Sequence, residues 1–177
     1  FDLESILVED IAEDDDYHGV RFMIIAYLGK AKICLQIDIG FSDVIYPEPR
    51  EIEYPSLLEL ETPKLLGYPI EAVIAEKYEA MISLGIRNSR YKDFYDILYL
   101  SQTYKIDGAI LQQALIHTFQ RRGTKFSMNI YQPEYLTDKE KFWDAFKRRI
   151  NSDSSIHFDE VIKQIQKFLL PVQNACE

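Results

Sequence analysis

The stretch AKICLQIDIGF, residues 31–41, decides the fold of the first part of this chain. Every second residue from Ile33 to Ile39 is an isoleucine or leucine, and the residues between them are mostly polar. Since successive side chains of a strand point to opposite faces, this alternation predicts a β-strand with one apolar face.

The residues before this stretch predict its neighbour in an antiparallel sheet. Residues 19–28 are rich in Val, Ile, Phe and Tyr, which favour strands. Gly29-Lys30 then fits a two-residue hairpin turn. If this turn joins the two strands, Arg21 falls opposite Asp38, where the two side chains can pair.

The remainder of the chain predicts a Pro-rich connection followed by helices. Five prolines lie between Tyr46 and Pro69, which is typical of irregular chain. Apolar residues then recur with helical periodicity over residues 70–84, 89–104, 107–121, 137–150 and 155–170, and the last helix is expected to stop before Pro171. We therefore predict an α+β fold. It has a partial antiparallel sheet in residues 1–46, including a strand at 5–11, a connection at 47–68 and a helical bundle in residues 69–177.

Composition excludes several classes of protein. The net charge of −9 argues against a general nucleic-acid coat, although a local basic patch could contact RNA. The basic runs Arg121-Arg122 and Lys147-Arg148-Arg149 fit such a patch, but helix-end dipoles explain them more simply. The longest apolar run, residues 22–28, is too short to span a bilayer. The two cysteines form no metal or redox motif, so we expect a cytoplasmic protein with no membrane partner.

Asp38 is the first of three polar anomalies. It lies between Ile37 and Ile39 in the strand that decides the fold. A sheet that presents an acid for catalysis would place it there, and so would a strand whose polar face is simply solvated. Pairing with Arg21 fits both interpretations.

Lys77 is the second anomaly. It lies in the middle of an apolar helical stripe, while Glu71, Glu76 and Glu79 lie off that stripe. The stripe consists of Ile70, Val73, Ile74, Met81 and Leu84. A lysine on a buried face must find an anion or extend to solvent. It could bind phosphate, or it could form a structural salt bridge.

Asp93 and Asp96 are the third anomaly, at the start of the next predicted helix. Asp93 falls on the same arc as Ile97 and Leu100, which turns it toward apolar neighbours. Acids near a helix N-terminus also favour the helix dipole, which is the simpler explanation. Because a buried charge needs a partner, we predict that Asp93 meets Lys77 across the two helices, facing the sheet side that carries Asp38.

Taken together, these segments resemble the AbiEii/AbiGii toxin family of nucleotidyltransferases. The most specific part is Ala75-Glu76-Lys77 followed by Lys92-Asp93-Phe94-Tyr95-Asp96. Other matching segments are residues 9–21, 35–41, 54–58, 90–91 and 118–122.

The resemblance implies a toxin of bacterial toxin–antitoxin and phage-defence systems that transfers a nucleotidyl group from an NTP, with Mg²⁺, to a tRNA or protein acceptor. It implies a nucleotidyltransferase-type sheet followed by helices, and a cognate antitoxin as partner. Asp38 matches the family's third sheet carboxylate, which could draw the proton from the acceptor hydroxyl. Lys77 matches the lysine expected at the nucleotide phosphates, and Asp93 and Asp96 match the last acidic motif.

The chain departs from the family pattern in one respect. Such enzymes begin with a Gly-Gly or Gly-Ser turn and an Asp-x-Asp pair that hold nucleotide and metal. No such glycine turn precedes Asp38 here, and Asp14-Asp15-Asp16, which has the Asp-x-Asp spacing, falls in a predicted turn and matches the family at a different place. We assign no metal ligand, and we expect the missing segment to lie upstream and the chain alone to be inactive. The alternative is a non-catalytic nucleotide- or protein-binding module. We also expect the partial sheet to expose an apolar face and support a homo-oligomer.

Overall fold

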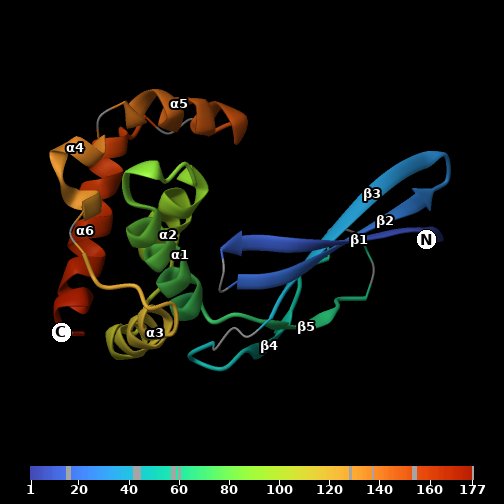
Figure 1. The fold of residues 1–177 in the computed structure, drawn as a ribbon, viewed down its shortest axis with the longest axis horizontal. Helices are drawn as coiled ribbons and strands as arrows, with labels where there is room; N and C mark the ends of the chain where they lie inside the picture. Colours follow the sequence, from blue (N-terminus) through green and yellow to red (C-terminus); the bar gives the residue numbers. More distant parts are fainter. Residues whose placement is uncertain are drawn as a thin grey trace. The chain divides into compact units, whose positions relative to one another are not determined.

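The computed structural model describes residues 1–14, 17–41, 45–56, 59, 61–127, 129–136, 138–152 and 155–176. The chain forms two compact units, Phe1–Asp43 and Val44–Glu177. The first contains a three-stranded sheet, and the second contains a short hairpin and helices (Figure 1). The α+β fold with a helical C-terminal part agrees with the prediction.

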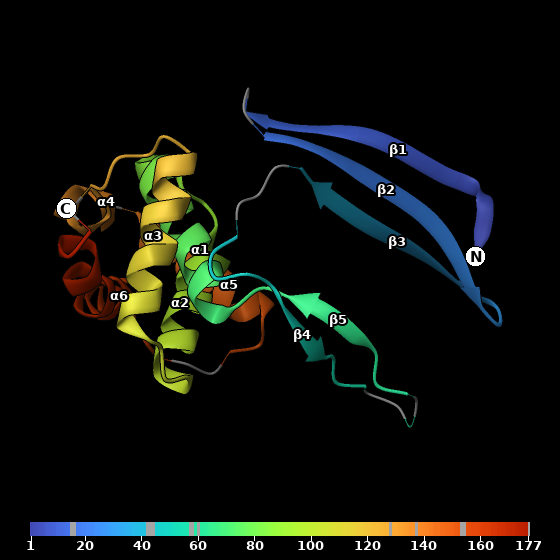
Figure 2. The same ribbon diagram turned by 90° about the horizontal axis from the view of Figure 1, so that it is seen from below.

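The first unit is an antiparallel sheet with the strand order β1-β2-β3 (Figure 2). The strands are β1 (Asp2–Asp14), β2 (Tyr17–Leu28) and β3 (Ala31–Gly40). Gly29 has a φ of 59° in the turn between β2 and β3, a conformation that favours glycine. Leu28 pairs with Ala31, so Arg21 lies opposite Asp38 as predicted.

The register gives this sheet one apolar face. On β2, Val20, Phe22 and Ile24 lie opposite residues 39, 37 and 35 of β3, all of them isoleucine or leucine. The adjacent positions, including Arg21 and Asp38, point to the other face. Ile37 remains 54% exposed, so the sheet itself does not bury this face.

The connection predicted as irregular contains a two-stranded antiparallel sheet, which corrects that prediction. Its strands are β4 (Arg50–Glu53) and β5 (Lys64–Gly67). The prolines flank these strands without interrupting them, at positions 47, 49, 55, 63 and 69. A proline just outside a strand removes no ladder hydrogen bond, so a Pro-rich segment can still hold two short strands.

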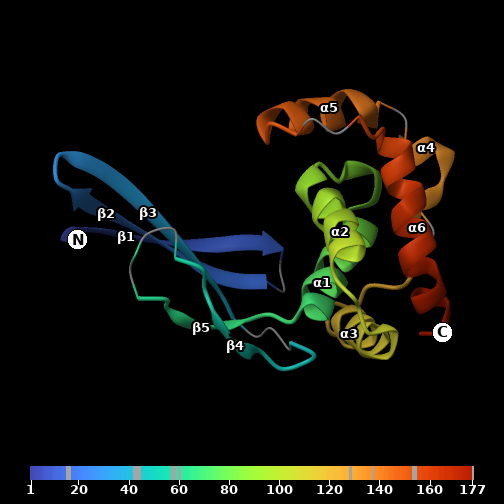
Figure 3. The ribbon, with the colours of Figure 1, turned by 180° about the vertical axis from the view of Figure 1, so that it is seen from behind.

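The second unit contains the five predicted helices in the predicted order, together with three short helical segments, η1, η2 and α4, that were not predicted (Figure 3). They are α1 (Ile70–Leu84), η1 (Gly85–Arg87), α2 (Tyr91–Thr103), α3 (Gly108–Arg121), η2 (Asn129–Tyr131), α4 (Pro133–Leu136), α5 (Lys139–Arg149) and α6 (Phe158–Asn174). Gly85, with a φ of 50°, ends α1 as predicted. The Asp107 side chain accepts hydrogen bonds from the Ala109 and Ile110 amides and caps α3.

α6 runs through Pro171, where the sequence predicted a stop. The last turn is held by tertiary contacts, because Gln173 is 2% exposed and accepts a hydrogen bond of 2.5 Å from the Tyr78 hydroxyl. Burial raises the pKa of Tyr78 to about 12, so the phenol stays protonated and can donate. This packing outweighs the local cost of the proline.

The core of the second unit is aromatic and fixes the α1–α2 hairpin. Phe94 on α2 packs edge-on against Phe158 at 5.1 Å between ring centroids, and Trp143 on α5 lies 5.7 Å from Phe158. Trp143, Phe94 and Phe158 are all essentially buried. α2 is therefore anchored from its apolar side, which leaves its acidic side free to meet α1.

Candidate functional site

A lysine–carboxylate cluster joins α1 and α2. The Lys77 ammonium lies 2.6 Å from Asp93 Oδ1 and 2.8 Å from Asp96 Oδ2. The contact between Lys77 and Asp93 is the one predicted from their places on apolar arcs. Asp96 joins it because it lies one helical turn further along the same side of α2.

The Lys77 ammonium is charged at neutral pH. Its side chain is 21% exposed, and those of Asp93 and Asp96 are 14% and 21% exposed. Burial is the largest single influence on the pKa of Lys77 and lowers it. The hydrogen bonds and charges of the two aspartates together outweigh burial and raise that pKa above its ordinary value.

Lys92 extends the cluster toward solvent. Its ammonium lies 2.5 Å from Asp96 Oδ2, and its side chain is 69% exposed. Asp96 therefore contacts two lysines at once, one partly buried and one exposed. The four side chains balance in charge, and the outer lysine is the one that an incoming anion can reach most easily.

Lys139, which was not among the predicted site residues, stabilises the turn between α1 and α2. Lys139 on α5 donates hydrogen bonds to the backbone carbonyls of Ile86, at 2.7 Å, and Asn88, at 2.8 Å. The Asn88 side chain in turn accepts from the Arg90 amide, at 2.7 Å. Lys139 lies on the apolar side of its helix with Trp143 and Phe146, so the pattern that singled out Lys77 could have found it.

Glu79 is a further residue that the pattern misplaced. It lies off the apolar stripe of α1, yet it is 2% exposed. Its carboxylate accepts hydrogen bonds from Arg122 Nη1, at 3.0 Å, and from the Thr124 hydroxyl. α1 packs against both α2 and α3, so its buried surface is wider than the stripe.

Asp38 lies on β3, in the first unit, and is held by a forked ion pair. Arg21 donates from Nε to Oδ1 at 2.8 Å and from Nη2 to Oδ2 at 2.9 Å, and Gln36 donates to both oxygens. The hydrogen bond from Arg21 is the main cause of a lowered pKa at Asp38. This carboxylate is therefore ionised at neutral pH and only weakly basic.

The structure thus brings together three of the four sequence-predicted site residues, Lys77, Asp93 and Asp96. That this cluster faces the sheet side of Asp38 stays a prediction. Among the described residues, no group of three or more His, Cys, Asp or Glu side chains could hold a metal ion. The Mg²⁺ that the resemblance implies therefore stays a prediction.

The lysine–carboxylate cluster on adjacent helices and the ionised carboxylate on a sheet strand lie at the residues that the resemblance assigns to a nucleotidyltransferase. The chain belongs to the AbiEii family: the sequence model described as "Nucleotidyl transferase AbiEii toxin, Type IV TA system" matches residues 2–164. The family implies a nucleotidyltransferase-like role in a toxin–antitoxin system and a cognate antitoxin as partner. No curated protein and no solved structure matches the chain. In the described part, no helix is long and apolar enough to cross a membrane.

Proposed function

We propose that this chain is the nucleotide-binding part of a toxin that transfers a nucleoside monophosphate from an NTP to an RNA or protein acceptor. The family supports the reaction class. The observation that carries the proposal is the Lys77 ammonium, which stays charged and partly buried between two helices. A positive charge of restricted exposure binds a polyanion more strongly than a fully solvated one, because water screens it less.

In this proposal the triphosphate takes over part of the contact that the carboxylates make in its absence. Phosphate oxygens replace Asp96 at the Lys77 ammonium, and Asp93 keeps that ammonium oriented. Lys92, which is largely exposed beside Asp96, gives the outer phosphates a second cation. Asp93 and Asp96 act as positioning residues here, because both contact the lysines.

Asp38 is proposed to receive the proton of the acceptor hydroxyl. It is ionised and fixed in direction by Arg21, which suits a group that must meet a hydroxyl in one geometry. Its lowered pKa makes Asp38 a weak base. The fixed orientation of its carboxylate would therefore contribute more to proton transfer than its affinity for the proton.

Residues 1–177 alone are expected to bind nucleotide without transferring it. The sequence has no Gly-Gly or Gly-Ser turn before Asp38, and Asp14-Asp15-Asp16, which has the Asp-x-Asp spacing, matches the family at a different place. The expected result is no incorporation of labelled NTP into tRNA or protein. Robust incorporation that Asp38→Asn abolishes would show that the catalytic metal site has been misplaced.

A non-catalytic nucleotide- or protein-binding module is the second candidate function. One observation favours it: each of the three candidate carboxylates already has a cationic partner, namely Arg21 for Asp38 and Lys77 for Asp93 and Asp96. A purely structural salt bridge has the same geometry. For either function we propose action in the cytoplasm, because neither Cys34 nor Cys176, both in the described part of the chain, forms a disulfide.

Calorimetric titration with each of the four NTPs tests the nucleotide site. Lys77→Met is expected to weaken affinity by roughly tenfold or more, the effect of losing a hydrogen bond to a charged group. Lys163→Met is the matched control, because Lys163 is an exposed helical lysine paired with Asp159. If Lys77→Met lowers the melting temperature and leaves nucleotide affinity unchanged, the cluster is structural and the proposed function fails.

A further inference from the structure

The helical unit has a concave site on another side of α2 from the lysine cluster. A hollow of about 210 Å³ lies between α2, α5, Ser152 and Ile156. Tyr95, Tyr99 and Gln102 line it from α2, and Trp143 and Lys147 line it from α5. Pockets for drug-sized ligands enclose about 300–1,000 Å³, so this one can admit a single ring system but not a whole nucleoside triphosphate.

Three aromatic side chains line this hollow, and one of them is open to solvent. The ring planes of Tyr95 and Tyr99 are within 9° of parallel, with centroids 6.4 Å apart, and Tyr99 is 50% exposed. Trp143 is fully buried at the base, where its indole N–H donates to the Ile156 carbonyl at 3.0 Å. The indole polar group is therefore already satisfied, and the ring that a ligand can stack on is that of Tyr99.

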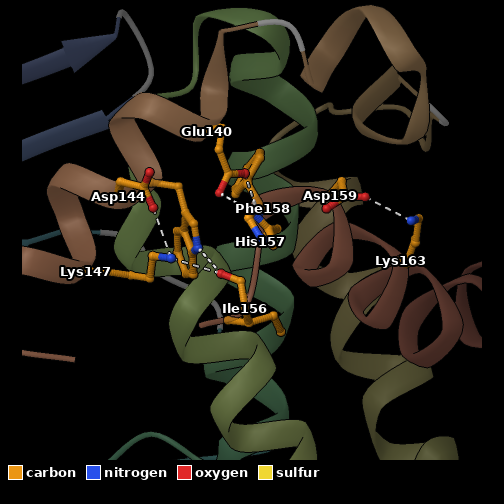
Figure 4. Close-up of polar contacts among 9 residues, drawn as sticks. Glu140, Asp144, Lys147, Ile156, His157, Phe158, Asp159 and Lys163 are labelled. Carbon is orange, nitrogen blue, oxygen red and sulfur yellow. Dashed lines mark hydrogen bonds and ion pairs between the residues drawn. The ribbon is translucent and has the colours of Figure 1, made fainter. Parts of the chain in front are cut away.

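One rim of the hollow is basic. Lys147 donates to the Ile156 carbonyl at 3.1 Å and pairs with Asp144 at 3.0 Å (Figure 4). Arg148 and Arg149 follow it in the exposed last turn of α5, and the Arg149 guanidinium lies 5.7 Å from the Phe146 ring. With Asp144 counted, the described side chains of this turn carry a net charge of +2, in a chain whose net charge is −9.

We propose that this hollow binds one base of a single-stranded RNA, whose adjacent phosphates lie on the Lys147–Arg149 turn. Aromatic faces beside cations are how single-stranded nucleic acid is bound without sequence reading, because every base has a stacking face. The helix dipole explains basic residues at the end of α5 but does not explain an open aromatic hollow beside them. An acidic protein segment would satisfy the cations yet leave the ring surface without a planar partner. The proposal is independent of the Lys77 site and needs no catalysis.

The single tryptophan of the chain makes the test direct. A short oligouridylate is titrated into the full chain at low salt, and Trp143 emission is expected to fall as a base enters the hollow. Tyr99→Ala should weaken affinity about fivefold or more, and Tyr99→Phe, which keeps the ring, should not. Tyr104→Ala is the matched control, because Tyr104 is 48% exposed and does not line the hollow. Arg148→Gln should weaken binding and reduce its dependence on salt.

Four outcomes would overturn the proposal. They are the absence of saturable quenching, equal effects of Tyr99→Ala and Tyr104→Ala, equal competition by a duplex of the same length, and tighter binding of an acidic peptide. The last would make the hollow a protein-docking site. Lys77→Met is expected to leave oligouridylate affinity unchanged. If it abolishes binding, the RNA occupies the lysine cluster and the second site does not exist.

Discussion

The Lys77 ammonium depends on its two carboxylates for its place in the α1–α2 contact. Burial alone would favour the neutral amine, and the aspartates reverse this preference. Replacing one member of an ion pair leaves the other as a partly buried charge that has lost a contact. Replacing both members leaves no charge that needs a partner. The three side chains are therefore expected to act as one energetic unit.

A double-mutant cycle on Lys77→Met and Asp93→Asn tests this unit. We expect a coupling of about 1–2 kcal/mol in the free energy of unfolding, the range for contacting residues of one polar network. Urea denaturation of the four chains measures it. The same cycle on Lys163 and Asp159, an exposed pair four residues apart, should give a clearly smaller coupling, because water screens these charges. Equal couplings for the two pairs would contradict the buried-unit interpretation.

The ion pair between Arg21 and Asp38 leads to a prediction about the pKa of Asp38. Because Arg21 lowers its folded-state pKa, the ion pair stabilises the fold above the unfolded-state pKa, and the contribution is lost as pH falls through the lowered value. In an NMR titration of carboxyl carbons, Asp38 should titrate below its ordinary 3.8, and Arg21→Gln should move it back toward that value. Asp159, whose pKa is lowered chiefly by Lys163, should not respond to Arg21→Gln. An unchanged Asp38 midpoint would count against the ion pair.

The sequence predicted those site contacts that depend on periodicity within one or two elements. Lys77 and Asp93 interrupt apolar arcs, and Arg21 meets Asp38 through a hairpin register, so both contacts follow from local pattern. Glu79 could not be placed in this way, because its burial depends on α3 and on Arg122, far along the chain. Long-range packing decides such residues, and a single helical wheel contains no information about it.

At the scale of elements, the α1–α2 hairpin holds the lysine cluster, and Gly85 sets its geometry. Gly85 has a φ of 50° and a ψ of −133°, which disfavours any residue with a Cβ. The hairpin is short, so a change of direction there would displace Lys77 relative to Asp93. Lys139 fastens the same turn from α5, which makes α5 part of the support of the site.

Gly85→Ala is predicted to destabilise the chain by about 1–3 kcal/mol, the cost of a strained backbone conformation. Gly108→Ala is the matched control. Gly108 is the first residue of α3, and an added Cβ there meets no atom within 4 Å, so the effect should be neutral or slightly stabilising. Thermal unfolding of both variants measures the difference. Equal melting temperatures would show that the Gly85 turn adapts freely.

Prolines explain why the predictions for β4, β5 and the end of α6 were wrong. They indicate irregular chain, yet β4 and β5 fit between them because each strand is only four residues long. In α6, Pro171 predicts a helix end, and the buried Gln173 shows why the helix continues. Local propensity is a weak prior, and tertiary contacts override it in both segments.

At the scale of the whole molecule, the apolar face of the first sheet leads to the last prediction. Ile33, Ile37 and Ile39 of β3 are 41%, 54% and 41% exposed, and they share this face with Phe22 of β2. Since β3 is at the edge of its sheet, its backbone could also pair with another strand. We expect concentration-dependent self-association in sedimentation velocity, which Ile37→Lys should reduce. Gln36→Lys places the same charge on the opposite face of the same strand and should leave association intact. Equal loss in the two variants would indicate pairing along the edge of β3. A strictly monomeric wild-type chain at high concentration would contradict self-association through either surface.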